Sequence, residues 1–386
     1  MLGVCNRTFR EAYLNTIETI LEDGKVVPSR DGGTLELHPF VAEITDPTKR
    51  QLLCVHRGND PFATLAETIW VLSGSRRIEW LEKFLPRCKD YSDDGKMWRA
   101  GYGNRIRSWL GMTDGEQDAR VNEPEMKMDI GELEGIDQIQ YIFETLKEDP
   151  ESRRAIISIW DPAKECTIGE SRDFPCCNLV HFMIRDNKLD CELFIRSNDV
   201  VFGFGSINVY EWTVLQEILA NALGVDVGSY FHIASSMHLY FDRHYTKARK
   251  ILKANQAIDY PPSFKFNFTN VNSGQRACTE AFNIIEELYM RITEYMDDPM
   301  GGIKAASDQA FFIANNAARE IFWFLMLRLL WQKDGKSEDF YNGYERVMEA
   351  TNFTDLKAGC DFWLRKKLHL VQPHELAKSI RLTEEG

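Results

Sequence analysis

One stretch, Phe174–Tyr240, constrains the fold more than any other part of this 386-residue chain. Residues 178–182 are predicted to form an alternating, half-buried β-strand, and residues 189–195 and 228–233 are predicted as two further strands. Residues 214–223 are mostly apolar and are followed by Gly224, a pattern that predicts a buried helix ending at that glycine. Strands and a helix in this order indicate a domain that mixes α and β structure.

The same stretch carries a candidate nucleophile. Cys176 follows Pro175, and a cysteine attacks a carbon atom only as a thiolate, which needs nearby positive charge. Arg196, which follows the second predicted strand, could supply that charge. The commonest role of a cysteine is nevertheless that of a small buried apolar residue, so the assignment also needs support from the neighbouring motifs.

Other side chains suit the binding of a pyrimidine nucleotide. His238 and Tyr240 are two residues apart in a predicted strand, so both can reach one sugar hydroxyl group from the same face. The amide of Asn208 can accept a hydrogen bond from N3–H and donate one to O4, which fits uracil. Glu67 lies in an apolar helical segment, where burial would raise its pKa and make it a general acid.

The order and spacing of these residues resemble the thymidylate synthase family, folate-dependent enzymes whose cysteine attacks C6 of a pyrimidine nucleotide. The resemblance covers roughly residues 8–268. It rests on the helix with Glu67, the DPESRR segment at 149–154, Pro175-Cys176, the Arg-Ser-x-Asp motif at 196–199, and His-Leu-Tyr at 238–240. The family has Pro-Cys-His where this chain has Pro-Cys-Cys, so Cys177 is a second candidate nucleophile, and we favour the cysteine that follows the proline.

The resemblance implies an α+β thymidylate synthase-like fold, with a large mixed β-sheet, flanking helices and a homodimer formed through the sheet. Residues 1–268 would form the catalytic domain. Residues 269–386 lie outside the resemblance, and their apolar spacing predicts a mainly helical C-terminal extension. The chain also ends differently from the family, whose short C-terminal tail closes over the folate.

The resemblance further implies a role for each site residue. The implied catalytic residues are Cys176, Glu67, Tyr102, Arg196 and Asp199. The implied substrate ligands are Arg30, Arg153, Arg154, Arg196 and Ser197 for the phosphate, Asn208 for the base, and His238 and Tyr240 for the sugar. Arg153 and Arg154 would reach across the dimer interface to the partner's phosphate. The implied folate contacts are Cys88, Asp199, Phe202, Gly203 and Tyr240.

The predicted product depends on Cys88. Counted back from Tyr102-Gly103, Cys88 falls on a family tryptophan that keeps water from the exocyclic methylene of the intermediate, and Tyr91 falls on a second tryptophan. A smaller side chain at that wall lets water approach the methylene, which favours attack by water over transfer of a hydride from the folate. We therefore expect a hydroxymethylase, as in phage members of the family, that converts dUMP, 5,10-methylenetetrahydrofolate and water into 5-hydroxymethyl-dUMP and tetrahydrofolate. The alternatives are a thymidylate synthase, a hydroxymethylase of dCMP or CMP, and a non-catalytic nucleotide-binding relative.

The composition argues against nucleic acid, metal ions and membranes as partners. The formal net charge of −13 argues against general nucleic-acid binding, which needs a basic surface. Nine irregularly spaced cysteines predict neither disulfides nor a metal site, and they fit the cytoplasm, or the host cytoplasm if the protein is viral. The most apolar run, residues 321–331, is about half a membrane span and contains Arg328, so we expect a buried helix and no membrane partner.

Overall fold

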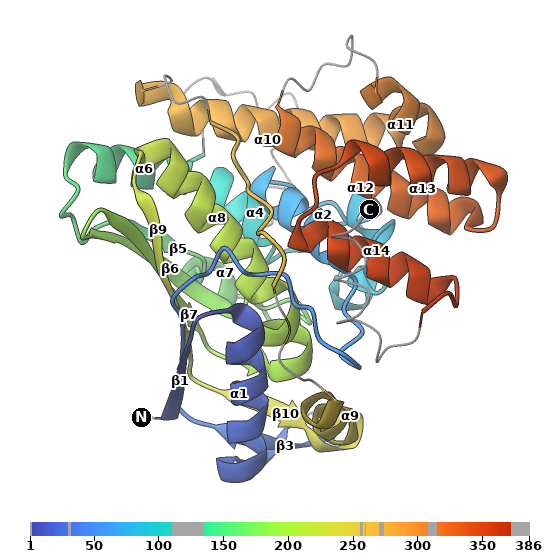
Figure 1. Ribbon diagram of the computed structural model, residues 1–386. Helices are drawn as coiled ribbons and strands as arrows, with labels where there is room; N and C mark the ends of the chain where they lie inside the picture. Colours follow the sequence, from blue (N-terminus) through green and yellow to red (C-terminus); the bar gives the residue numbers. More distant parts are fainter. Residues whose placement is uncertain are drawn as a thin grey trace.

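The computed structural model describes residues 2–29, 32–109, 135–254, 258, 260–269, 274–307 and 315–371. Its strands form a six-stranded and a four-stranded sheet. Figure 1 shows helices on one side of the larger sheet and a further group of helices, coloured orange and red, built from the C-terminal part of the chain.

The six-stranded sheet is mixed. Strands β1/β4 and β7/β9 pair in parallel, and the other neighbours pair antiparallel. Along β6, β7 and β9, buried and half-buried residues largely alternate, as the sequence pattern predicts. In sheet order the strands are β1 (Leu2–Asn6), β4 (Phe40–Ile44), β9 (Asp226–Ala234), β7 (Lys188–Ile195), β6 (Cys177–Arg185) and β5 (Ile156–Ser158).

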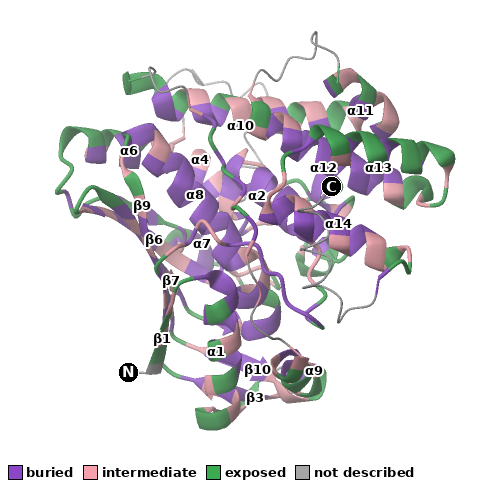
Figure 2. Ribbon diagram, viewed as in Figure 1, coloured by how far each residue is buried: buried purple, intermediate pink, exposed green. Residues whose placement is uncertain are grey.

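Helix α8 (Asn208–Leu223) is the central helix of the molecule. It packs on β7 and β9, while α2 (Pro61–Leu72), α6 (Gln138–Glu148) and α10 (Ala277–Tyr295) pack against it. All but one of its residues are buried (Figure 2). Gly224 ends the helix with φ at +75°, a left-handed conformation that a residue with a side chain rarely adopts. The prediction of a buried helix that ends at Gly224 is thus confirmed.

The four-stranded sheet brings together distant segments. Its register pairs His238 with Glu36 in one neighbouring strand and with Asp199 in the other. A kinked helical segment, Val200–Ile207, connects this sheet to α8. In sheet order the strands are β2 (Lys25–Ser29), β3 (Gly32–Leu37), β10 (Met237–Tyr240) and β8 (Asn198–Asp199).

Several shorter helices complete the part of the chain before residue 269. Helix α1 packs between the two sheets, in contact with β1, β3 and β4. The remaining bounds are α1 (Phe9–Asp23), α3 (Ile78–Glu82), the 3₁₀ turn Cys88–Tyr91, α4 (Tyr102–Arg107), α7 (Pro162–Glu165) and α9 (Phe241–Ala254).

The C-terminal region is helical, as expected, and shares the hydrophobic core of the rest. α10, α12 and α14 all pack against α2, and buried residues of these helices belong to the same apolar cluster as Ile17 and Leu193. The proposed boundary at residue 268 therefore stays a prediction. Besides α10, the helices are α11 (Pro299–Ser307), α12 (Asn316–Asp334), α13 (Glu338–Ala350) and α14 (Asp355–Lys367). None of the helices in the described ranges combines the length and apolarity that crossing a bilayer requires.

An ion pair connects α12 to the start of α2. Asp60 caps α2, because its Oδ1 atom accepts the backbone N–H groups of Phe62 (3.0 Å) and Ala63 (3.2 Å). Its Oδ2 atom accepts hydrogen bonds of 3.3 Å from the guanidinium group of Arg328. That group also lies over the rings of Trp331 (4.9 Å) and Trp363 (4.8 Å).

We predict that Arg328→Ala lowers the free energy of unfolding by about 2 kcal/mol, because it leaves the half-buried Asp60 carboxylate without its cation and removes contacts with two indole rings. Urea unfolding monitored by circular dichroism measures the change. The control is Gln332→Ala, at an exposed position of the same helix. Equal losses in the two variants would contradict a stabilising role for the ion pair.

Candidate active site

A cavity of about 410 Å³ lies where α2, α4, α8 and the loop before β6 meet. It brings together residues that are more than 140 positions apart in the sequence. The predicted site residues that line it are Glu67, Tyr102, Cys176, Arg196, Ser197 and Asn208.

Cys176 lies beside a guanidinium group in this cavity. Its Sγ atom is 4.0 Å from Nη2 of Arg196, whose Nε atom donates to the carbonyl group of Pro175 at 3.0 Å. Burial raises the pKa of the Cys176 thiol, and the positive charge of Arg196 opposes that rise. The arrangement provides the cation that a thiolate nucleophile requires.

Cys177 occupies a different environment. It is fully buried, and burial raises the pKa of its thiol well above the ordinary value. Its backbone N–H donates to the hydroxyl group of Tyr102 at 3.2 Å. Of the cysteines in the described residues, Cys176 is the one that lines the cavity, which supports the choice of Cys176 over Cys177.

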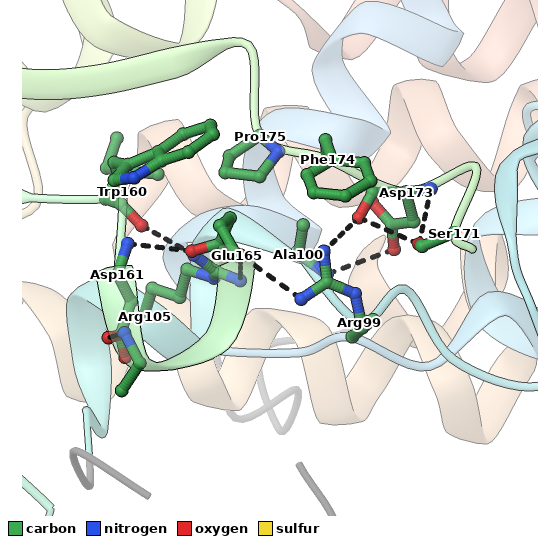
Figure 3. A network of polar contacts seen from close by, with 12 residues as sticks. Arg99, Ala100, Arg105, Trp160, Asp161, Glu165, Ser171, Asp173, Phe174 and Pro175 are labelled. Atoms are coloured by element: carbon green, nitrogen blue, oxygen red, sulfur yellow. Dashed lines mark hydrogen bonds and ion pairs between the residues drawn. The ribbon is translucent and has the colours of Figure 1, made fainter. Parts of the chain in front are cut away.

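A buried network holds the loop that carries Cys176 (Figure 3). Arg105 binds both carboxylate oxygens of Glu165, at 3.1 and 2.7 Å, and Arg99 binds the same carboxylate at 3.1 Å. Arg99 also donates to the backbone carbonyl group of Asp173, and the Asp173 carboxylate accepts the backbone N–H of Ala100 at 3.0 Å. Burial alone would raise the pKa of Glu165, but its contacts with Arg105 outweigh this and lower it. The loop is therefore anchored by charged hydrogen bonds.

Two carboxyl groups face the cavity. Burial raises the pKa of Glu67 to about 7. Burial, and then the charge of Glu67, raise the pKa of Glu211 well above the ordinary value. No lysine or arginine in the described parts of the chain contributes to either shift. Glu211 was not predicted from the sequence, where its signal is an acidic residue three positions after Asn208 in a mostly apolar helix.

Asn208 is held by polar neighbours at both ends of its amide. Its Oδ1 atom accepts a hydrogen bond of 2.8 Å from Nδ2 of Asn198, and its Nδ2 atom donates to Oε1 of Glu211 at 3.4 Å. Asn208 thus begins α8 with its amide at the cavity wall.

A family model described as thymidylate synthase matches residues 11–296, which is most of the chain. The chain belongs to the thymidylate synthase family. This match extends beyond residue 268, into α10.

Three curated relatives have names more specific than that of the family. The chain is similar to proteins named deoxyuridylate hydroxymethyltransferase from three phages. It is 28% identical to the Bacillus phage SP01 protein over 305 residues, which cover 75% of each chain. It is 34% identical to the Delftia phage PhiW-14 protein over 227 residues and 28% identical to the Pseudomonas phage M6 protein over 243 residues. These two matches span 56% and 62% of the relatives' lengths.

Asp199 and Phe202, for which the resemblance implies folate contacts, lie in β8 and just after it, outside the lining of the cavity. Asp199 accepts the backbone N–H groups of Val201 and Phe202 through Oδ1, both at 2.7 Å. Its buried Oδ2 atom has no hydrogen-bond partner among the described residues, so it can accept from an N–H group of a ring. The Phe202 side chain is 57% exposed, which leaves a ring face available for stacking. These features fit a pterin.

Some predicted site residues lie away from the cavity lining. His238 and Tyr240 are neighbours on β10, with ring centroids 5.2 Å apart. Burial lowers the pKa of His238, and the charge of Asp199 opposes this. Arg153 and Arg154 are exposed just before the edge strand β5. Gly203 packs against Asn198 and Asn208, and Arg30 lies outside the described residues.

Cys88, which the sequence comparison places at the wall of the site, lies behind the residues that line the cavity in this structure. Cys88 is fully buried and does not line the cavity; its thiol faces the carbonyl group of Ile78. Tyr91 and Trp98 line the cavity on this side, and the indole N–H of Trp98 donates to the backbone carbonyl group of Cys88 at 2.8 Å. Counting residues located the right segment, but the direction of each side chain depends on how the 3₁₀ turn Cys88–Tyr91 packs.

We predict that Glu67→Gln changes the pH dependence of stability. Because the folded protein holds the Glu67 pKa at about 7, against 4.5 ordinarily, its contribution to stability is complete below pH 4.5 and is lost as pH rises through 7. Between pH 5 and pH 8, wild-type protein will therefore lose about 2 kcal/mol of unfolding free energy more than the variant. Urea titrations at both pH values test this. Glu79→Gln, at an exposed position of α3, serves as the control, and parallel curves for wild type and Glu67→Gln would contradict the prediction.

Proposed function

We propose that this protein hydroxymethylates dUMP at C5, with 5,10-methylenetetrahydrofolate as the one-carbon donor and tetrahydrofolate and 5-hydroxymethyl-dUMP as products. The observation that carries the proposal is the pairing of Cys176 with Arg196 in a cavity that Glu67 and Asn208 also line. The phage relatives named deoxyuridylate hydroxymethyltransferase support the same reaction.

The chain's own residues supply the first step. The Cys176 thiolate adds to C6 of the pyrimidine, and the electron pair of the C5–C6 double bond moves toward the O4 carbonyl group, which makes C5 nucleophilic. Arg196 stabilises the thiolate, and with Ser197 it binds the phosphate group of the nucleotide. Glu67, whose pKa is about 7, protonates the developing negative charge on O4, either directly or through water.

The folate supplies a one-carbon unit at formaldehyde oxidation level to C5. Loss of the C5 proton and release of tetrahydrofolate leave an exocyclic methylene on the nucleotide. A water oxygen then bonds to that methylene carbon and gives up a proton to a base. The electron pair moves back through the ring, the C5–C6 double bond re-forms, and the thiolate of Cys176 leaves.

The choice of water rather than hydride as the last reactant rests on the relatives. The cysteine at position 88 no longer provides the reason, because Tyr91 and Trp98 line that side of the cavity. A barrier difference of about 1.4 kcal/mol between the two steps changes the product ratio tenfold, so small differences in water access decide the product. Thymidylate formation is the competing outcome of the assay below.

We further propose a homodimer in which Arg153 and Arg154 bind the phosphate in the partner's site. Both arginines are exposed next to the edge strand of the six-stranded sheet, and neither lines the cavity of its own chain. The sheet face opposite α8 carries mostly half-buried side chains along β6, β7 and β9, which suits contact with a second copy.

Product analysis tests the reaction. Purified protein incubated with dUMP, methylenetetrahydrofolate and ¹⁸O-labelled water is expected to yield 5-hydroxymethyl-dUMP that carries the label, with little absorbance change from dihydrofolate. Cys176→Ser is expected to abolish turnover, whereas Cys177→Ser retains it, because only Cys176 lies at the cavity and Arg196. Thymidylate with stoichiometric dihydrofolate, or an active Cys176→Ser variant, would contradict the proposal. Parallel assays with UMP and dCMP show which sugar and which base the enzyme accepts.

Subunit mixing tests the shared phosphate site. Cys176→Ser protein and an Arg153→Ala/Arg154→Ala double variant are each expected to be nearly inactive as homodimers. A mixed dimer contains one site with both the cysteine and the partner's arginines, so mixing is expected to restore activity. Verified mixed dimers that remain inactive, or a monomeric active protein, would contradict the shared site.

A further inference from the structure

A second buried carboxyl group faces the cavity besides that of Glu67. Glu211 lies in the first turn of α8, is 2% exposed and lines the same cavity as Cys176. Its Oε1 atom accepts a long hydrogen bond of 3.4 Å from the amide of Asn208. Within the part of the chain that the structure describes, no group hydrogen-bonds to its Oε2 atom. One oxygen atom of this carboxyl group is therefore available to a ligand in the cavity.

The surroundings of Glu211 keep a proton on its carboxyl group. The titratable side chains that influence its charge, or are influenced by it, come from four elements: Glu67 on α2, Tyr102 on α4, Cys177 on β6 and Tyr230 on β9. None of these side chains carries a positive charge. A buried carboxylate without a cation is unfavourable, and the charge of Glu67 makes it more so. Burial and then Glu67 thus raise the pKa of Glu211 well above its ordinary value, and the group is a carboxylic acid at neutral pH.

The protonated form can donate as well as accept. An ionised carboxylate only accepts hydrogen bonds, whereas a carboxylic acid also donates one. In the proposed reaction, O4 of the pyrimidine gains negative charge when the thiolate adds to C6, when C5 loses its proton and when water adds to the methylene. The enolate oxygen formed in these steps has more lone pairs than a carbonyl oxygen, so it can accept an additional hydrogen bond. A donor placed there lowers the barrier because it binds the intermediate more strongly than the substrate.

We propose that Glu211 is a second catalytic carboxyl group, which donates a hydrogen bond from its acid O–H to O4 of the nucleotide when negative charge develops on that oxygen. The inference rests on the proposed function, with the NH₂ group of Asn208 at O4 of uracil. Because the same NH₂ group donates to Oε1 of Glu211, O4 and the Glu211 carboxyl group lie on the same side of that amide. Glu67, with a pKa of about 7, gives up its proton, whereas Glu211 keeps its own.

Two substitutions at position 211 separate hydrogen-bond donation from proton transfer. Glu211→Gln keeps the shape of the side chain and an N–H donor, but it has no acidic proton to transfer. Glu211→Leu fills a similar volume and removes the donor. The assay is tritium release from [5-³H]dUMP in the presence of methylenetetrahydrofolate, with kcat and KM determined separately. Covalent trapping with 5-fluoro-dUMP counts the folded sites, so unfolded protein does not affect kcat.

The matched control is Glu320 on α12. Its carboxyl group is also buried, at 7% exposure, and accepts the amide of Asn352 at 2.6 Å, but it lies outside the cavity lining. Glu320→Gln and Glu320→Leu are therefore expected to keep the wild-type kcat. Glu211→Leu is expected to lower kcat about a hundredfold and to change the KM for dUMP less than about threefold, because the hydrogen bond forms mainly in the intermediates. Glu211→Gln is expected to stay within about tenfold of the wild-type kcat.

Infrared difference spectroscopy detects the proton on Glu211 directly. The spectrum of wild-type protein minus that of Glu211→Gln, at neutral pH, is expected to contain the C=O stretching band of a carboxylic acid. This band is expected to shift when dUMP binds, because the acid O–H then lies against O4. A carboxylate band in its place, or an acid band that dUMP does not shift, would overturn the inference. This measurement decides if Glu211→Leu does not fold.

The kinetic outcomes distinguish this inference from the proposed function. Absence of tritium release with the unsubstituted protein would overturn the proposed function, and this inference with it. Release with the unsubstituted protein, but a kcat of Glu211→Leu within about threefold of wild type or no lower than that of Glu320→Leu, would overturn only this inference. Equal losses in Glu211→Gln and Glu211→Leu would indicate proton transfer in place of hydrogen bonding and would overturn it as well.

Discussion

The burial of α8 is the constraint on which the rest of the structure depends. Because the helix is covered by the sheet on one side and by helices on the other, each polar side chain on it needs a partner inside the protein. Glu217 forms a 2.6 Å ion pair with Arg50, and the amide group of Gln216 donates to backbone carbonyl groups of β7 and β9. Asn208 and Glu211, at the start of the helix, instead reach the cavity. The cavity is thus the place where the buried helix presents polar groups.

The same burial sets the electrostatics of the site. It raises the pKa values of Cys176, Glu67 and Glu211, and the Arg196 guanidinium opposes the rise at the thiol. Arg196 itself is exposed, so its charge acts on Cys176 through direct contact at 4.0 Å. A site of this kind favours neutral carboxyl groups, which can donate protons, and a thiol that becomes a nucleophile only beside its cation.

The C-terminal helices contribute to this site through α2. The Asp60–Arg328 ion pair attaches α12 to the beginning of the helix that carries Glu67. A second attachment ties α14 to the segment that follows α9: Asp355 accepts the backbone N–H of Phe264 at 2.8 Å and donates its own N–H to Pro262 at 2.8 Å. Burial raises the pKa of Asp355 to about 7. The C-terminal helices are in this respect part of the support of α2, the helix that carries Glu67.

The amino-acid sequence by itself determined the strands of the 174–240 stretch, the buried helix that stops at Gly224, the apolar surroundings of Glu67 and the family motifs. These depend on residues a few positions apart, whose spacing sets which side chains share a face. Only the tertiary structure decided that Cys176 and not Cys177 reaches the cavity, that Cys88 lies behind Trp98, and that Glu211 joins Asn208. It also decided that the C-terminal helices share the core of the sheet domain. These outcomes depend on contacts between segments that are far apart in the chain, and such contacts fix the direction of a side chain in a way that local spacing does not.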